Sequence, residues 1–170
     1  TQIREGYEAP LIKDLLQETK ILFLNAEEAK TFTRLRGDIA SGPRSRYAGQ
    51  ARSASIEEAL KVGTSNGAKI MCVTDGGNGA YLSDGKEVFF CPALEDAEVV
   101  DATGAGDGFA VGVTWAIMKG LDLSEALHVG MINATSVISF VGTQKGLLTD
   151  TEIRSRLQES TLTVTSSSLS

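Results

Sequence analysis

The stretch Asp101-Ala102-Thr103-Gly104-Ala105-Gly106-Asp107 leads into residues 107–118, which are mostly apolar and predict a helix. Small residues let the backbone approach a ligand closely, and the N–H groups at the start of a helix point outward. The helix dipole adds about half a positive charge at that end. This stretch therefore predicts a cradle for an anion such as a phosphate group.

An acid, Asp107, closes the predicted cradle, although a carboxylate repels a phosphate placed beside it. Such an acid makes sense if it accepts a proton from an incoming hydroxyl group while the amides hold the charge that develops on a phosphoryl group. The alternative is that Asp107 only caps the helix. The run of small residues before it, together with the second acid Asp101, favours the catalytic interpretation.

Two further polar loops follow short apolar runs, 20–25 and 69–74, that predict buried strands. The loop at 74–79 reads Thr-Asp-Gly-Gly-Asn-Gly, and ligands of open α/β sheets lie beyond the carboxyl ends of the strands. Asn25 and Glu28 stand three residues apart at a predicted helix start, where both could hold the water shell of Mg²⁺. A plain glycine turn and an ordinary Asn cap remain the open alternatives.

Two familiar glycine motifs are absent. No GxxxxGK[ST] string occurs in the chain, so a P-loop is excluded. A dinucleotide fingerprint counted from Gly104 requires a small residue at its sixth position, and Phe109 stands there.

The rest of the chain predicts an α/β sheet layered by helices, with one antiparallel hairpin. Asp84-Gly85 is the hairpin turn, and Ser55 with Glu58 forms a capping-box pattern that predicts a helix start at Ser55. Helices are expected at 8–19, 26–36, 55–66, 107–118, 124–141 and 149–157, and strands at 20–25, 69–74, 79–83 and 86–91. We expect a long loop at 37–55, whose arginines either meet phosphate or belong to a solvated insertion, and a frayed polar tail at 159–170.

Composition excludes several classes of protein. The 170 residues carry 16 basic and 22 acidic side chains, so the net charge of −6 argues against a general binder of nucleic acid or of anionic membranes. Cys72 and Cys91 lie in apolar stretches and are expected to be buried, reduced thiols, and with one histidine a structural zinc site is excluded. No signal peptide is visible, so we expect a cytoplasmic protein. Residues 126–144 lack charge but contain polar side chains, which indicates a buried helix and not a membrane span.

The order strand–NxxE, strand–TxGxxG and then DATGAGD before an apolar helix resembles the ribokinase-like (PfkB) family of carbohydrate and nucleoside kinases. Ala102 is the one departure from that family's usual DTTGAGD. The resemblance covers residues 1–158 and implies a Rossmann-like layered sheet with flanking helices. It identifies the chain as the C-terminal nucleotide-binding and catalytic part, without the family's N-terminal half and lid. The chain is then either a truncated kinase, which we favour, or a stand-alone half.

The resemblance implies an ATP-dependent transferase that phosphorylates a hydroxymethyl group of a sugar or nucleoside, a small-molecule substrate. The alternative is a non-catalytic nucleotide-binding or interaction module on the same fold. The resemblance also allows a homodimer, and no nucleic-acid or membrane partner is expected. The implied site residues are Asp107 as catalytic base; the amides of Gly104, Ala105, Gly106 and Asp107 as anion hole; Asn25 and Glu28 for Mg²⁺ through water; Thr74, Gly76, Gly77 and Gly79 for ATP; Asn133 near the adenine; and Asp101, Thr103 and Gly142 for a monovalent cation such as K⁺.

Overall fold

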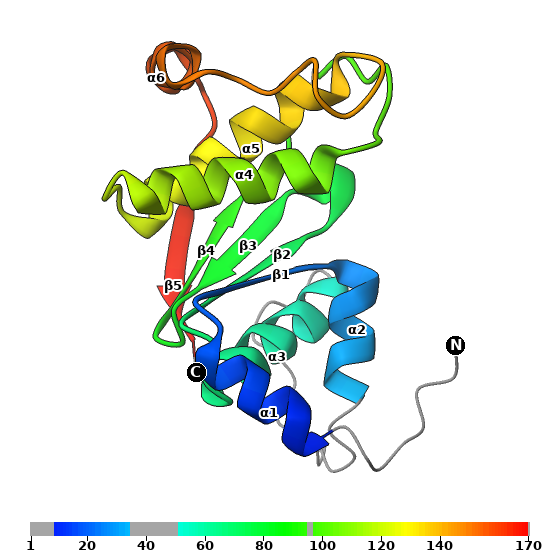
Figure 1. Cartoon of the computed structure of the whole chain (residues 1–170), viewed down its shortest axis with the longest axis vertical. Coiled ribbons are helices and arrows are strands. Elements are labelled where there is room, and N and C mark those ends of the chain that lie inside the picture. The colour runs from blue at the N-terminus through cyan, green and yellow to red at the C-terminus, as the bar shows by residue number, and fades with distance from the viewer. Residues whose placement is uncertain (1–8, 35–50, 95–96, 170) are drawn as a thin grey trace. The chain divides into compact units, whose positions relative to one another are not determined.

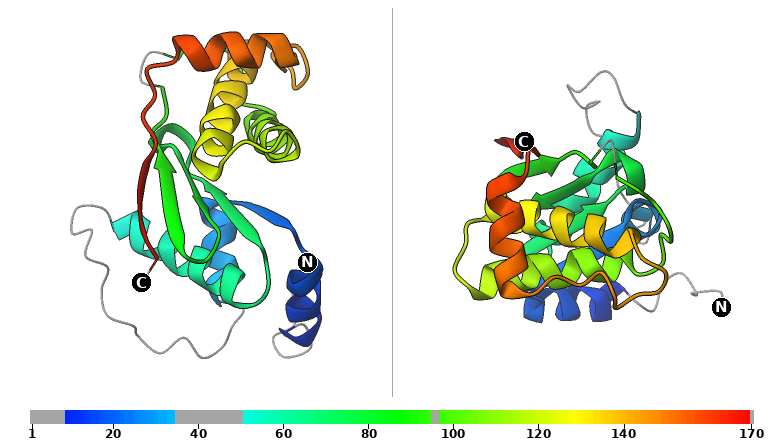
Figure 2. Two further views of the ribbon diagram at one scale, coloured as in Figure 1. Left: turned by 90° about the vertical axis from the view of Figure 1, so that its left-hand side faces the viewer. Right: turned by 90° about the horizontal axis from the view of Figure 1, so that it is seen from above.

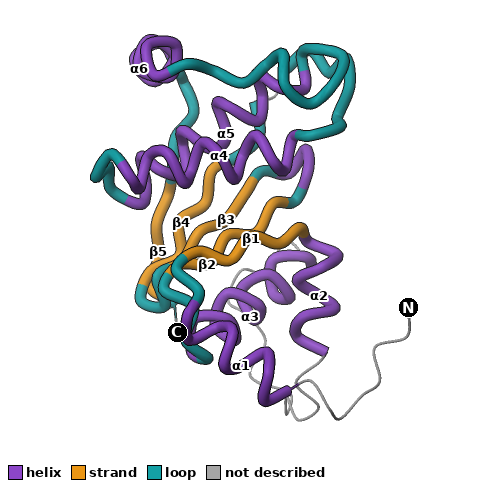
Figure 3. Tube along the Cα trace, viewed as in Figure 1, coloured by secondary structure: helices purple, strands orange, loops and turns teal. Residues whose placement is uncertain are grey.

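A computed structural model describes residues 9–34, 51–94 and 97–169 of the chain. Its helices are α1 (Ala9–Glu18), α2 (Ala26–Arg34), α3 (Ala51–Ser65), α4 (Ala105–Met118), α5 (Leu123–Ile138) and α6 (Asp150–Glu159), with a short 3₁₀ turn η1 (Gly76–Asn78) (Figure 1). Its strands are β1 (Ile21–Asn25), β2 (Ile70–Thr74), β3 (Ala80–Ser83), β4 (Glu87–Cys91) and β5 (Thr165–Ser168) (Figure 3). The alternation of strands and helices confirms the predicted α/β class.

The five strands form one sheet in the order β1-β2-β3-β4-β5. The predicted hairpin joins β3 and β4, and its turn is held by the side chain of Asp84. The carboxylate oxygen Oδ1 of Asp84 accepts hydrogen bonds from the N–H groups of Lys86 (2.9 Å) and Glu87 (3.0 Å). Gly85 has φ of +87°, a conformation that favours glycine, so the Asp-Gly pair specifies this turn.

The start of α3 differs from the prediction. Ser55 was expected to cap this helix, but α3 already begins at Ala51, so Ser55 lies inside it. Alanine and arginine propagate helices well, and the residues that precede Ser55 (Ala51, Arg52 and Ala54) extend the helix past the apparent cap. The end of α3 was predicted correctly, and Gly67 follows it with φ of +125°. The remainder of the expected loop, residues 37–50, lies outside the described residues.

The end of the chain also differs from the prediction. Residues 165–168 form β5 at the edge of the sheet beside β4, where we expected a frayed tail. The N–H of Leu169 donates a hydrogen bond of 2.8 Å to the carbonyl of Lys86. Thr165–Ser168 has no apolar alternation, so pairing with β4 and not hydrophobic patterning makes this strand.

Several helix boundaries differ from the prediction by a few residues. α4 begins at Ala105 and not at Asp107, while α5 ends at Ile138 and not at residue 141. α5 begins with a full capping box, in which Asp122 and Glu125 satisfy each other's backbone N–H groups. None of the helices in the described ranges is long and apolar enough to cross a membrane.

The chain falls into two compact units, each with a core of its own. The first comprises Thr1–Val73, Ser83–Val88 and Ser168–Ser170, and the second comprises Thr74–Leu82 and Phe89–Ser167. In the first unit, Leu60 of α3 and Met71 of β2 are fully buried. In the second, α4 and α5 lie side by side (Figure 2), and Phe109, Val113 and Val129 are among their buried residues.

The two cysteines are buried and unpaired, as predicted. Burial raises the pKa of the Cys91 thiol to about 11 and raises the pKa of the Cys72 thiol further. Because the thiolate is the reactive form, both residues are inert parts of the core at neutral pH.

Candidate functional site

The N-terminus of α4 forms an anion cradle from main-chain N–H groups. Gly104 is the N-cap with φ of +85°, which a residue with a side chain rarely adopts. Within the described part of the chain, the N–H groups of Gly104, Gly106 and Asp107 have no acceptor, and that of Ala105 makes only a 3.3 Å bond to the carbonyl of Ala102. A Cβ atom built on Gly106 would meet no protein atom within 4 Å. Three free donors therefore lie at the positive end of the helix dipole, with open space beside Gly106.

Asp107 is the third residue of α4, and its side chain is exposed. The cap position belongs to Gly104, which makes no side-chain cap bond, so Asp107 is not the helix cap. A carboxylate in the first turn interacts favourably with the helix dipole without filling the cradle's hydrogen bonds. The structure thus leaves an accessible acid beside the unsatisfied N–H groups.

Asp101 holds the loop that enters the cradle. Its Oδ1 accepts a 2.9 Å hydrogen bond from the N–H of Thr103, and its Oδ2 accepts a 3.2 Å bond from the N–H of Gly142. Hydrogen bonds from the side chain and the backbone of Thr103, and then from Gly142, lower the pKa of Asp101. An ionised Asp101 therefore ties residues 101–103 to the segment that follows α5.

The same segment supports Gly104. A Cβ atom on Gly104 would lie 2.9 Å from the Cβ of Thr143, so the backbone of the cap packs directly on this side chain. The carbonyl of Ile138, the last residue of α5, accepts hydrogen bonds from the N–H groups of Val100 (2.8 Å) and Asp101 (3.1 Å). The approach to the cradle is thus fixed on the C-terminal end of α5. The family resemblance pointed to Gly142 but not to Thr143, because an exposed threonine carries no signal of a contact 39 residues away.

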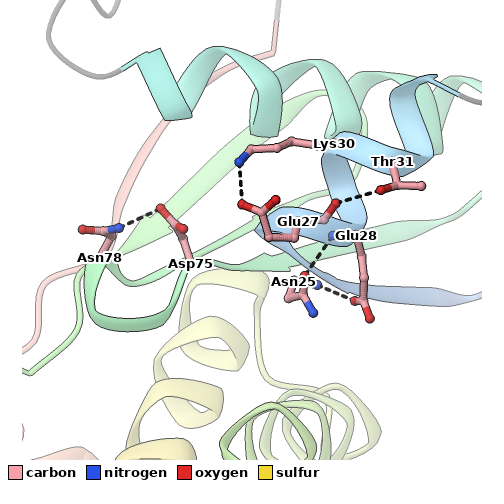
Figure 4. A network of polar contacts seen from close by, with 7 residues as sticks. All are labelled: Asn25, Glu27, Glu28, Lys30, Thr31, Asp75 and Asn78. Atoms are coloured by element: carbon pink, nitrogen blue, oxygen red, sulfur yellow. Dashed lines mark hydrogen bonds and ion pairs between the residues drawn. The ribbon is translucent and has the colours of Figure 1, made fainter.

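The loop at 74–79 contains a tight turn with open space beside it. The N–H of Asp75 donates to the carbonyl of Gly79 (2.8 Å), and the Nδ2 of Asn78 donates to the Oδ2 of Asp75 (2.9 Å) (Figure 4). Gly79 has no room for a side chain, since a Cβ there would lie 2.2 Å from the carbonyl oxygen of Cys91. A Cβ atom built on Gly76 or on Gly77 would have no protein atom within 4 Å. The close packing of the turn therefore requires a glycine at position 79. Gly76 and Gly77 instead leave the backbone accessible to a ligand.

Asn25 and Glu28 come together as a capping box at the start of α2. The N–H of Asn25 donates to the Oε2 of Glu28 (2.8 Å), and the N–H of Glu28 donates to the Oδ1 of Asn25 (2.9 Å) (Figure 4). This is the Asn-cap alternative that the sequence left open. Both side chains are exposed, so their predicted role toward Mg²⁺ stays a prediction beside this structural one.

Asn133 lies in the middle of α5 with only 1% of its surface exposed. Its Nδ2 donates to the carbonyl of Gly108 (2.6 Å), and its Oδ1 accepts from the N–H of Leu148 (3.0 Å). Both ends of the side-chain amide are therefore used inside the protein. The family resemblance implied that this residue lies near the adenine of ATP, which stays a prediction, and the structure shows hydrogen bonds to two other segments that the sequence did not reveal.

Comparison with known proteins identifies the family. Residues 4–150 match the family described as pfkB family carbohydrate kinase, so the chain belongs to this family. It is 36% identical over 85 residues to the fructosamine kinase of Bacillus subtilis (strain 168), a match that covers 50% of this chain and 30% of that protein. It is 30% identical over 105 residues to the ribokinase of Lactococcus lactis subsp. lactis (strain IL1403), which covers 62% of this chain and 33% of that protein.

Solved structures share the fold. The ribokinase of Thermotoga maritima superposes with a TM-score of 0.69 at 22% identity, over 86% of this chain and 44% of that one. The nucleoside kinase of Methanocaldococcus jannaschii gives a TM-score of 0.68 at 23% identity, over 91% and 46% respectively. The ribokinase-like α/β fold is thereby confirmed, and the chain spans less than half the length of the relatives that it matches.

Proposed function

We propose that this chain is the nucleotide-binding and catalytic part, within residues 1–158, of an ATP-dependent kinase that phosphorylates a hydroxymethyl group of a sugar or nucleoside. The observation that carries the proposal is the start of α4, where free N–H groups border open space beside the exposed carboxylate of Asp107. Relatives named as ribokinase, fructosamine kinase and nucleoside kinase support this class of substrate.

Asp107 is the general base of the proposed reaction. Its carboxylate accepts the proton of the substrate's hydroxyl group, whose oxygen bonds to the γ-phosphorus as the bond to the leaving ADP breaks. The N–H groups of residues 104–107 donate hydrogen bonds to the phosphoryl oxygens as charge develops on them. A placed base contributes about 10²–10⁴ in rate. Each lost oxyanion donor costs about 10²–10³.

The 74–79 loop is the proposed contact for the rest of ATP, through Thr74 and its glycines. Gly76 and Gly77 fit this role because the space beside their backbone is open. Asn25 and Glu28 would act on Mg²⁺ through its water shell, and the bound ion would neutralise phosphate charge. The carbonyl groups around Asp101, Thr103 and Gly142 stay the proposed ligands for a monovalent cation such as K⁺, and the observed bonds to the Asp101 carboxylate come from the N–H groups of Thr103 and Gly142 and do not involve these carbonyls. No step is assigned to such an ion.

A non-catalytic nucleotide-binding module is the alternative function. The free N–H groups alone would serve such a module equally well. Asp107 separates the two, because an acid beside an anion cradle weakens phosphate binding: a binding module does not need this acid, whereas a kinase uses it to accept a proton.

The test is ADP release by the full product of the gene, measured in a coupled assay with a panel of sugars and nucleosides. We expect release that depends on one of these alcohols and falls by about 10²-fold or more in Asp107→Asn. Asp14→Asn is the matched control, since Asp14 is also an exposed helical aspartate and lies on α1. Unchanged release in Asp107→Asn would refute the mechanism, and ATP binding without alcohol-dependent release would favour the module.

A further inference from the structure

Asn133 makes two hydrogen bonds from the middle of α5 to other segments of the second unit. Its side-chain amide reaches the carbonyl of Gly108 at 2.6 Å and the N–H of Leu148 at 3.0 Å, across 25 and 15 residues of sequence. A buried amide with both ends satisfied holds its partners strongly, because breaking either bond leaves a buried polar group unpaired. The contacts of each partner show what this amide holds in place.

Gly108 belongs to the first turn of α4 and directly follows Asp107. Its N–H donates to the carbonyl of Gly104 at 2.8 Å, which closes that turn. Glycines let α4 approach α5 closely: a Cβ on Gly108 would lie 2.8 Å from the Cγ2 of Val137, and one on Gly112 would lie 2.9 Å from the carbonyl oxygen of Val129. The hydrogen bond from Asn133 therefore anchors the first turn of α4, which carries the cradle, to the closely packed helix α5.

Leu148 ends the segment that runs from the C-terminus of α5 to α6. Near the start of this segment, Gly142 donates to Asp101 and Thr143 packs on Gly104. Further along, Gly146 packs so closely that a Cβ there would lie 2.4 Å from the carbonyl oxygen of Ser136. The bond from Leu148 to Asn133 fastens the far end of the segment to the same helix. The cradle is thus supported on both sides by contacts that lead back to α5.

We infer that Asn133 is a positioning residue for phosphoryl transfer, acting through the Gly108 carbonyl and the Leu148 amide. The inference rests on the proposed function, because Asn133 holds the cradle to which that function assigns phosphoryl transfer. With 1% of its surface exposed and both ends of its amide bonded inside the protein, Asn133 acts on the site through these partners. A shift of about 1 Å in such a support lowers turnover by up to about 10²-fold.

The first test compares Asn133→Asp with Ser136→Ala in the full gene product. Aspartate keeps an acceptor for Leu148 but places an oxygen opposite the Gly108 carbonyl, so it breaks one bond at nearly constant volume. Ser136 is a matched control: it lies one turn further on α5, is 3% exposed, and its hydroxyl has no partner among the described residues. We expect kcat to fall roughly 10–100-fold in Asn133→Asp with KM for ATP near its original value, and little change in Ser136→Ala.

Two outcomes of this test would overturn the inference. If Asn133→Asp keeps the original kcat, the Gly108 bond does not position the cradle. If its loss is confined to KM or to the dissociation constant for ATP, Asn133 is a nucleotide contact and not a positioning residue.

The second test is amide hydrogen exchange, which needs no activity. In the unsubstituted protein, the Leu148 amide should exchange as slowly as amides inside α5, although it lies outside any helix or strand. In Asn133→Asp, exchange should speed up at Gly108 while Leu127 and Val129 stay protected. A Leu148 amide that exchanges like an exposed loop amide in the unsubstituted protein would overturn the inference even if the variant does not fold.

Asp107→Asn, measured in parallel, separates this inference from the proposed function. If Asp107→Asn retains turnover, the proposed function fails, and hydrogen exchange still decides whether Asn133 braces α4. If Asp107→Asn loses turnover while Asn133→Asp keeps it, the proposed function stands and only this inference fails.

Discussion

Two aspartates of one short motif lie in different surroundings. Hydrogen bonds from the side chain and the backbone N–H of Thr103, and then from the N–H of Gly142, lower the pKa of Asp101 and hold its carboxylate in the loop. Asp107 lies six residues on, exposed in the first turn of α4. The sequence predicted the cradle and the importance of both acids. It did not predict which acid is structural, because the partner of Asp101 at Gly142 stands 41 residues away.

Gly106 provides a residue-level prediction in which stability and activity move in opposite directions. A methyl group at this position meets no protein atom within 4 Å, and alanine favours helix more than glycine does by up to about 1 kcal/mol. Gly106→Ala should therefore raise the free energy of unfolding. The same methyl group would obstruct a phosphate that approaches the free N–H groups, so kcat/KM for ATP should fall about tenfold or more. Thermal unfolding and steady-state kinetics check both parts, and an unchanged kcat/KM would contradict the cradle.

At the level of helices, the close packing of α4 on α5 depends on glycine. Gly112→Ala would place a Cβ 2.9 Å from the carbonyl oxygen of Val129 and 3.0 Å from the Cα of Gly130, and both are backbone atoms that move only with the helix. We expect a loss of about 1–3 kcal/mol in the free energy of unfolding, measured by denaturant titration. Gly106→Ala in the same helix is the control. An unchanged free energy of unfolding in Gly112→Ala would show that α4 and α5 can move apart at little cost.

The contact between α5 and the end of α6 predicts a pH effect on stability. The Nε2 of His128 lies 2.7 Å from the Oγ of Ser160, and partial burial lowers the pKa of His128. The folded state therefore disfavours the protonated ring, so the unfolded state binds the proton more readily. The contribution of His128 to the free energy of unfolding is fully present above its pKa in the unfolded state, about 6.5. It is lost as the pH falls through the lower pKa of the folded state. Denaturant titrations at about pH 7 and about pH 5 should show this loss, and His128→Gln should reduce it. An unchanged pH dependence in His128→Gln would assign the effect to other groups.

Strands and helices were predictable where the local pattern and the tertiary structure agree. The apolar runs of β1 and β2 and the Asp-Gly hairpin turn are local signals, and each was found where expected. The capping pattern at Ser55 was a local signal that good helix formers before it overrode. β5 could not be predicted, because a strand of threonine and serines forms only through its partner β4.

For the molecule as a whole, β1 is an edge of the described sheet and is made of apolar residues. Ile21, Leu22, Phe23 and Leu24 are all partly exposed, so neither face of this strand is fully covered. An apolar edge strand is a template for pairing with another strand. We expect this 170-residue chain to self-associate in a sedimentation velocity series at rising concentration, and Leu22→Lys to reduce the association. A chain that stays monomeric throughout the series would show that β1 is already protected.

Separating ATP binding from phosphoryl transfer in Asp107→Asn tests the account most directly. Calorimetric titration of the full gene product gives the dissociation constant for ATP, and a single-turnover experiment gives the rate of transfer to the alcohol. We predict a transfer rate lower by about 10²–10⁴. The dissociation constant for ATP should stay the same or fall, because a negative charge beside the phosphates has been removed. An unchanged transfer rate, or a loss explained entirely by weaker ATP binding, would contradict the role of Asp107 as the base.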